Sequence, residues 1–149
     1  ERALNSGIDQ IILGSLAVKD SILFHEIASS YPDKIIFGLD TKNDHVKSEA
    51  WTEDSGVYWI DLVKKFNDLP LNSIIFTDID RDGMLNGPNL EKITELTSNT
   101  SLPVIASGGV SSLEDLIQLK KIKGVSGVIS GKALYENTFS LDEALNLIS

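Results

Sequence analysis

The chain lacks cysteine altogether, so it contains no disulfide, no thiolate nucleophile and no sulfur-ligated metal site. Basic residues are scarce as well, because 13 Lys and Arg stand against 22 Asp and Glu and leave a net charge of −9. A general nucleic-acid surface needs clustered basic residues, so we expect no nucleic-acid partner. No apolar run approaches the ~18 residues of a membrane span, and the N-terminus lacks a signal-peptide pattern. We expect a soluble, cytoplasmic protein without a membrane partner.

Five short apolar runs, rich in β-branched residues, alternate with segments of helical periodicity. The runs cover residues 10–13, 34–39, 73–76, 102–106 and 127–129, and each is followed by small or acidic residues. Helical patterns cover 19–30, where Ile22, Leu23 and Ile27 share one face, 57–67 and 90–98. This alternation predicts a parallel sheet wrapped by helices, in which ligands bind at the C-terminal ends of the strands.

Two Ser–Glu pairs have the spacing of a capping box, in which the serine begins a helix. They are Ser111 with Glu114 and Ser140 with Glu143. We therefore expect helices to begin next to these two serines.

An internal repeat narrows the architecture. Residues 7–14 align without gaps with residues 124–131, which is an offset of 124 − 7 = 117 residues. At about 30 residues per strand–helix unit, that offset is four units, or half of an eight-unit barrel. We predict a partial (β/α)8 TIM barrel: residues 1–149 would be the C-terminal portion of a single barrel domain, its last five strand–helix units with parallel strands. The alternative is a complete small α/β domain.

Asp40 directly follows the run 34–39 and would lie at the mouth of the sheet, where a carboxyl group can act as a general acid. Its alternative interpretation is a helix cap or a turn aspartate. The spacing of Asp78, Asp80 and Asp82 resembles the start of a calcium-binding loop, but the twelfth position is Asn89 instead of glutamate. We predict no metal site.

Glycine-rich turns follow the last two runs, at Ser107-Gly108-Gly109 and at Gly131. Exposed N–H groups in such turns can hold a phosphate, although the glycines could equally serve tight turns alone. By the internal repeat, Gly14 and Ser15 would form a second phosphate site, so we expect a ligand with two phosphates. Trp51 lies in a polar segment, 41–56, that has the character of a lid; it could stack on a heterocycle or pack on a helix.

Four stretches carry a resemblance to a known family: GLDTKNDHVKSEAWTEDSG (38–56), FTDIDRDGMLNGPNL (76–90), PVIASGGVSSLEDL (103–116) and GVISGKALYE (127–136). Together they resemble the ProFAR isomerases of histidine biosynthesis, over essentially the whole chain. The cyclase subunit of imidazole glycerol phosphate synthase shares the IDRDG core and remains the alternative. Thr77-Asp78 and the segment after Asp40 favour the isomerase.

The resemblance implies an Amadori rearrangement of an aminoaldose to an aminoketose, without cofactor or metal, on a ribotide with two phosphates. Asp40 matches the family's general acid, and a second aspartate on the first strand is not in this sequence. Thr77 and Asp82 match residues at the substrate, and Trp51 fits the isomerase segment. The phosphate loops match Ser107, Gly108, Gly109, Gly131 and Lys132.

The same resemblance predicts how these residues behave alone. Without the second aspartate and three strands, we expect them to be inactive and to self-associate through unpaired edge strands, whereas the full-length protein would be monomeric. The alternative from another class is a non-catalytic, phosphate-binding module resembling a half-barrel.

Overall fold

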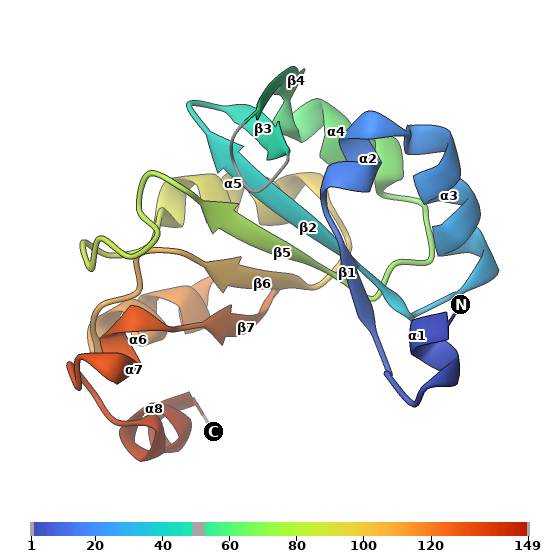
Figure 1. Cartoon of the computed structure of the whole chain (residues 1–149). Helices are drawn as coiled ribbons and strands as arrows, with labels where there is room; N and C mark the ends of the chain where they lie inside the picture. The colour runs from blue at the N-terminus through green and yellow to red at the C-terminus, as the bar shows by residue number, and fades with distance from the viewer. Residues whose placement is uncertain (1, 49–52, 149) are drawn as a thin grey trace.

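The computed structural model describes residues 2–48 and 53–148, and its centre is a mixed sheet of seven strands. Five of the strands are mutually parallel, in the order β1-β2-β5-β6-β7 (Figure 1). They are β1 (Ile11–Leu13), β2 (Ile35–Lys42), β5 (Ser73–Asp78), β6 (Val104–Ser107) and β7 (Val125–Ile129). All five predicted strands are therefore confirmed, as is their parallel direction.

Two further strands, β3 (His45–Ser48) and β4 (Glu53–Tyr58), form an antiparallel hairpin on the end of β2. The sequence analysis predicted no strand in segment 41–56, so this part of the prediction is wrong, and the lid character of the segment stays a prediction. Asn43 and Asp44 connect β2 to β3, and both have positive φ, 49° and 64°, as the two central residues of a tight turn between antiparallel strands require. Trp51 lies outside the described residues.

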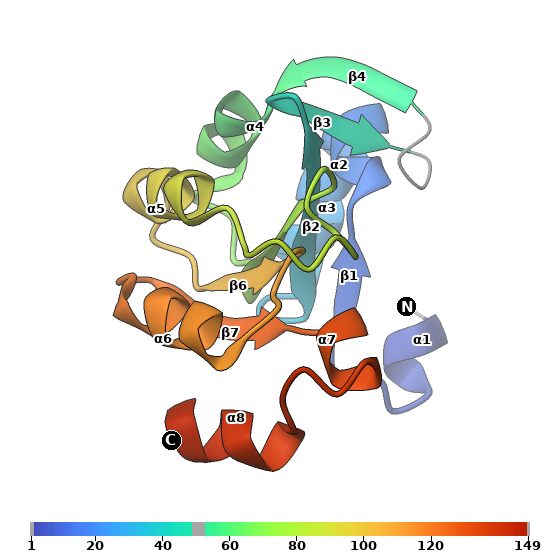
Figure 2. The same cartoon turned by 90° about the vertical axis from the view of Figure 1, so that its left-hand side faces the viewer.

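In the described part of the chain, eight helices precede, connect or follow the parallel strands (Figures 1 and 2). They are α1 (Arg2–Asn5), α2 (Ser15–Lys19), α3 (Ser21–Ser30), α4 (Trp59–Phe66), α5 (Leu90–Asn99), α6 (Leu113–Lys121), α7 (Lys132–Tyr135) and α8 (Leu141–Ile148). The two views place α4, α5 and α6 on one side of a curved sheet. The arrangement is a mixed α/β fold with a mostly parallel sheet.

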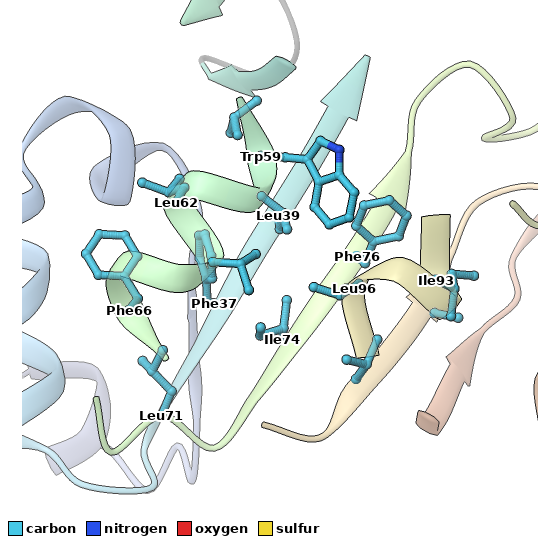
Figure 3. Close-up of a cluster of buried hydrophobic side chains, with 14 of the residues drawn as sticks. Phe37, Leu39, Trp59, Leu62, Phe66, Leu71, Ile74, Phe76, Ile93 and Leu96 are labelled. Atoms are coloured by element: carbon cyan, nitrogen blue, oxygen red, sulfur yellow. The ribbon is translucent and has the colours of Figure 1, made fainter. Parts of the chain in front are cut away.

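The core lies between this side of the sheet and the helices. Figure 3 shows Phe37, Ile74 and Phe76 of the strands facing Trp59 and Phe66 of α4, and all five side chains are at most 2% exposed. The Trp59 and Phe76 rings lie 5.6 Å apart between centroids. Burying each aromatic side chain contributes about 1.5–3 kcal/mol, so this layer fixes β2 and β5 against α4.

Three of four predictions for the later helices are confirmed. Pattern 57–67 corresponds to α4, pattern 90–98 corresponds to α5, and Ser140 and Glu143 form the expected reciprocal cap at α8. The cap of α6 is wrong by one residue, since Ser112 and Asp115 form the box there.

The helix expected over 19–30 is interrupted at Asp20, whose carboxylate accepts a hydrogen bond from the Leu23 N–H at 3.0 Å and caps α3. Phe24 and Ala28 of α3 lie in the core, and Ile27 packs against it. Ile22 and Leu23 are 73% and 41% exposed. The predicted apolar face is therefore right for Ile27 and wrong for Ile22 and Leu23.

Candidate functional site

Four parallel strands place one residue each in a row at their C-terminal ends. Asp40 of β2 lies beside Thr77 of β5, Thr77 beside Ser107 of β6, and Ser107 beside Ile129 of β7. Residues paired in this way point to the same face, and neighbouring strands are about 4.8 Å apart. Strand register thus brings the predicted acid Asp40 next to Thr77.

This row forms the floor of a cavity of about 340 Å³. Asp40 is partly exposed there, whereas Thr77 is 7% exposed. The cavity is lined by Ile12, Gly14, Ser15, Gly38, Asp40, Lys47, Ile75, Thr77, Ser107 and Ile129. The structure therefore gathers Asp40, Thr77 and the predicted second phosphate turn around one hollow.

A second cavity, of about 380 Å³, adjoins the first, because Ser107 and Ile129 line both. Its other lining residues are Asp82, Gly83, Leu85, Gly108, Gly109, Val110, Ser130, Gly131 and Lys132. Every predicted site residue that the structure describes lines one of these two cavities.

Gly108 and Gly109 allow the loop after β6 to pack against the loop after β5. Their φ values are +91° and +84°, and a Cβ on Gly109 would overlap the Gly87 carbonyl oxygen. The Gly87 N–H donates to the Gly109 carbonyl at 2.9 Å. The close packing of the two loops therefore requires glycine at these positions, and the glycine backbone also lines the second cavity.

Asp78 holds the loop that presents Asp82. It is 4% exposed, and its carboxylate accepts hydrogen bonds from the Asp80 N–H at 3.1 Å and from the Asn89 side-chain amide at 2.7 Å. The Asp82 N–H donates to the Asp78 carbonyl at 3.0 Å. These bonds close the turn and leave the Asp82 side chain exposed beside the second cavity.

Lys132 joins α7 to the same loop. Its ammonium donates to the Gly83 carbonyl at 2.9 Å and lies 3.7 Å from the Glu136 carboxylate. The Lys132 side chain thus bridges the loops after β5 and β7 at the second cavity.

The internal repeat is visible in the backbone. Gly14 has φ −111° and ψ −75°, and Gly131, 117 residues later, has φ −110° and ψ −81°. Each precedes a short helix. Ile12 and Ile129 are also 117 residues apart, and both line the first cavity. The two copies of the repeat therefore place an isoleucine and a glycine turn of the same conformation at β1 and at β7, the two outer strands of the parallel set.

A family model described as a histidine biosynthesis protein matches residues 1–140. The chain belongs to this histidine biosynthesis family. A relative from Prochlorococcus marinus (strain MIT 9211) is 46% identical over 147 residues, which cover 97% of this chain and 58% of the relative. Relatives from Roseobacter denitrificans and Jannaschia sp. are each 44% identical, over 99% and 98% of this chain.

These relatives are named as imidazole-4-carboxamide isomerases, and the name of each includes two phosphoribosyl groups. The chain spans about three fifths of the length of these relatives. The family resemblance stated from the sequence is therefore confirmed, and the isomerases are the proteins that the chain is similar to.

One charged residue at the first cavity was not predicted by the sequence analysis. Lys47 comes from β3, a strand that the sequence analysis did not predict. The dipeptide Asn43-Asp44 suits a two-residue turn. A turn there would have predicted a strand that returns along the end of β2 and carries Lys47.

No helix among residues 2–48 and 53–148 is both long enough and apolar enough to span a membrane.

Proposed function

We propose that residues 1–149 form the last five strand–helix units of a single (β/α)8 barrel domain in a ProFAR isomerase. Five parallel strands with helices between them support the architecture, and the repeat of 117 residues supports an eight-unit whole. The names of relatives at 44–46% identity support the activity. The protein acts in histidine biosynthesis in the cytoplasm, and the full-length form is monomeric.

The pairing of Asp40 with Thr77 at the cavity is the observation that most directly supports the chemistry. The Asp40 carboxyl group donates its proton to the ribose ring oxygen as the C1–O bond breaks. The glycosylamine nitrogen supplies the electron pair that forms the Schiff base. A base from outside these residues then removes the C2 proton, and the enamine so formed tautomerises to the aminoketose. The product is an isomer, so acid–base groups suffice without cofactor or metal.

The two cavities suit the two ends of a bis-phosphorylated ribotide. Gly108, Gly109 and Gly131 would offer backbone N–H groups to one phosphate, with Lys132 beside them. Gly14 and Ser15 would hold the other phosphate beside Asp40. Ser107 lines both cavities, so a single extended ligand could reach from one phosphate site to the other.

Two side chains between these ends would contact the sugar under reaction. Thr77 points into the first cavity next to Asp40, and Asp82 lies at the second cavity on the loop that Asp78 closes. Loss of either contact would weaken substrate positioning more than folding, because neither side chain belongs to the hydrophobic core.

Replacing Asp40 by Asn in the full-length protein tests the assignment. Conversion of ProFAR should fall by about 10²–10⁴-fold, the usual contribution of a general acid, while the far-UV spectrum and melting temperature stay unchanged. Asp33→Asn is the matched control, since Asp33 lies before the opposite end of β2 and its φ of 59° suits asparagine. Near-normal turnover by Asp40→Asn would remove Asp40 as the acid.

The full-length protein also distinguishes the isomerase from the alternative, a non-catalytic phosphate-binding module. Native mass spectrometry and a melting shift with the ribotide should give a monomer that binds and converts it. A discrete dimer that binds phosphorylated sugars without conversion would favour the half-barrel-like module instead. Cyclase activity, the other alternative, would appear as turnover of the aminoketose product with an ammonia source.

A further inference from the structure

Lys47 falls opposite Asp40 when the register of the antiparallel pair β2 and β3 is extended by one residue. The ladder pairs Thr41 with Val46 and Lys42 with His45. Continuing that register by one residue brings Lys47 opposite Asp40. Directly opposed residues in an antiparallel pair point to the same face, with Cβ atoms about 4.5–5.5 Å apart.

Burial shows which face this is. Thr41 and Val46 are 0% and 2% exposed, and Val46 belongs to the hydrophobic core. Because side chains alternate along a strand, their neighbours Asp40 and Lys47 point away from that core. Both residues line the first cavity, which agrees with this direction.

Charge in the two cavities is arranged in the same way, with one carboxylate and one ammonium group in each. Asp40 and Lys47 are the charged residues that line the first, and Asp82 and Lys132 those that line the second. A phosphate at Gly14 and Ser15 would add negative charge to a protein whose net charge is already −9. A cation in the same cavity would attract that phosphate.

We propose that Lys47 is a phosphate-binding residue of the first cavity, and that its ammonium group contacts the ligand phosphate held at Gly14 and Ser15. This inference depends on the proposed function, because it assigns a contact to one end of the same bis-phosphorylated ligand. The β3–β4 hairpin then has a specific role, which is to carry this cation over the end of β2.

Lys47→Met in the full-length protein removes the charge and keeps the aliphatic stem. The KM for the ribotide should rise about 10- to 100-fold, as expected for a lost hydrogen bond between charged groups, with kcat within about threefold. Lys47→Arg should keep KM within about threefold, because guanidinium also binds phosphate. The dependence of KM on salt concentration should weaken in Lys47→Met.

Lys42→Met is the matched control. Lys42 is the last residue of β2, pairs with His45 of β3 and carries the same charge. Its ammonium lies 3.8 Å from the Asp80 carboxylate, and Lys42 does not line the cavity. Equal KM values for Lys47→Met and Lys42→Met would overturn the inference while leaving the isomerase assignment intact. Absence of turnover in the unmodified protein would instead overturn the proposed function.

Folding of the variants is followed by the melting temperature. Where Lys47→Met melts below the assay temperature, Lys47→Gln and Lys47→Arg replace it. A raised KM in the Gln variant with a normal KM in the Arg variant supports the phosphate contact, and equal KM values in the two variants refute it.

Discussion

The hydrogen bond between the Asp78 carboxylate and the Asn89 amide should be the strongest single polar link in the loop after β5. It is 2.7 Å long, spans eleven residues of sequence, and involves a carboxylate in a residue that is 4% exposed. Asn89 also caps α5, because its side-chain oxygen accepts from the Lys92 N–H at 3.2 Å. The pair therefore connects the end of β5 to the start of α5.

Exchanging the two side chains tests this link. Asp78→Asn alone places an amide against the Asn89 amide and leaves a buried donor unpaired, which costs about 1–3 kcal/mol. Asn89→Asp alone sets two carboxylates against each other and should cost at least as much. The double variant restores one amide and one carboxylate, still accepts from the Asp80 N–H, and still offers an oxygen to cap α5.

Urea and thermal unfolding of the chain and its three variants complete a double-mutant cycle. We expect a coupling free energy of about 2 kcal/mol or more, and each single variant should melt about 2–4 °C lower per kcal/mol lost. The double variant should recover most of that loss. A coupling below about 0.5 kcal/mol, with the two single effects simply adding, would show that the bond does not hold the loop.

Two further variants test other loops by their stability. Gly109→Ala should lower the free energy of unfolding in urea by more than about 2 kcal/mol, because a positive φ strains alanine and the new Cβ would overlap the Gly87 carbonyl. Gly83 has φ +69° and open space around it, so Gly83→Ala should lower it by about 1 kcal/mol. Equal losses in the two variants would contradict this difference. At α8, the Ser140 N–H and hydroxyl donate to the Glu143 carboxylate and hold its pKa below the ordinary 4.5. That stabilisation is present above about pH 4.5 and is lost as the pH falls through the lower folded-state pKa. Glu143→Gln should therefore show a smaller loss of stability on acidification, and an unchanged pH profile would contradict the role of this cap.

The parallel strands were predictable because burial on both faces requires continuous apolar runs. Ile74 and Phe76 are at most 1% exposed, and the run 73–76 marked their strand. The hairpin left no such signal, since Val46 of β3 reaches the core and its polar neighbours His45 and Lys47 do not. Propensity is weak for such a polar ribbon, and pairing with β2 decides its structure.

The error in the helix around residue 20 has a different physical origin. Periodicity over 19–30 allowed more than one apolar face, and the sequence analysis chose the one with Ile22 and Leu23. Asp20 caps α3, which starts at Ser21 instead of residue 19, and Phe24 of this helix packs on Phe37 of the sheet. Packing against the sheet decides which face of the helix is buried, and an average over the window could not show that choice.

The candidate site residues were easier to predict than the residues that hold their loops in place. Asp40, Thr77 and Ser107 each come at the end of a strand, so sequence order alone predicted that they share one edge. The role of Asp78 in closing its loop depends on Asn89, eleven residues away, and no local pattern predicts that contact.

The backbone similarity of Gly14 and Gly131 bears on how a two-phosphate ligand would lie. Both turns have nearly the same φ and ψ and both follow an isoleucine that lines the first cavity, yet they belong to β1 and β7, at opposite ends of the row of parallel strands. A ligand held by both turns must therefore cross the ends of β2, β5 and β6. Asp40, Thr77 and Ser107 lie on that path, so the atoms between the two phosphates, where the ring opens, would pass directly over the proposed acid.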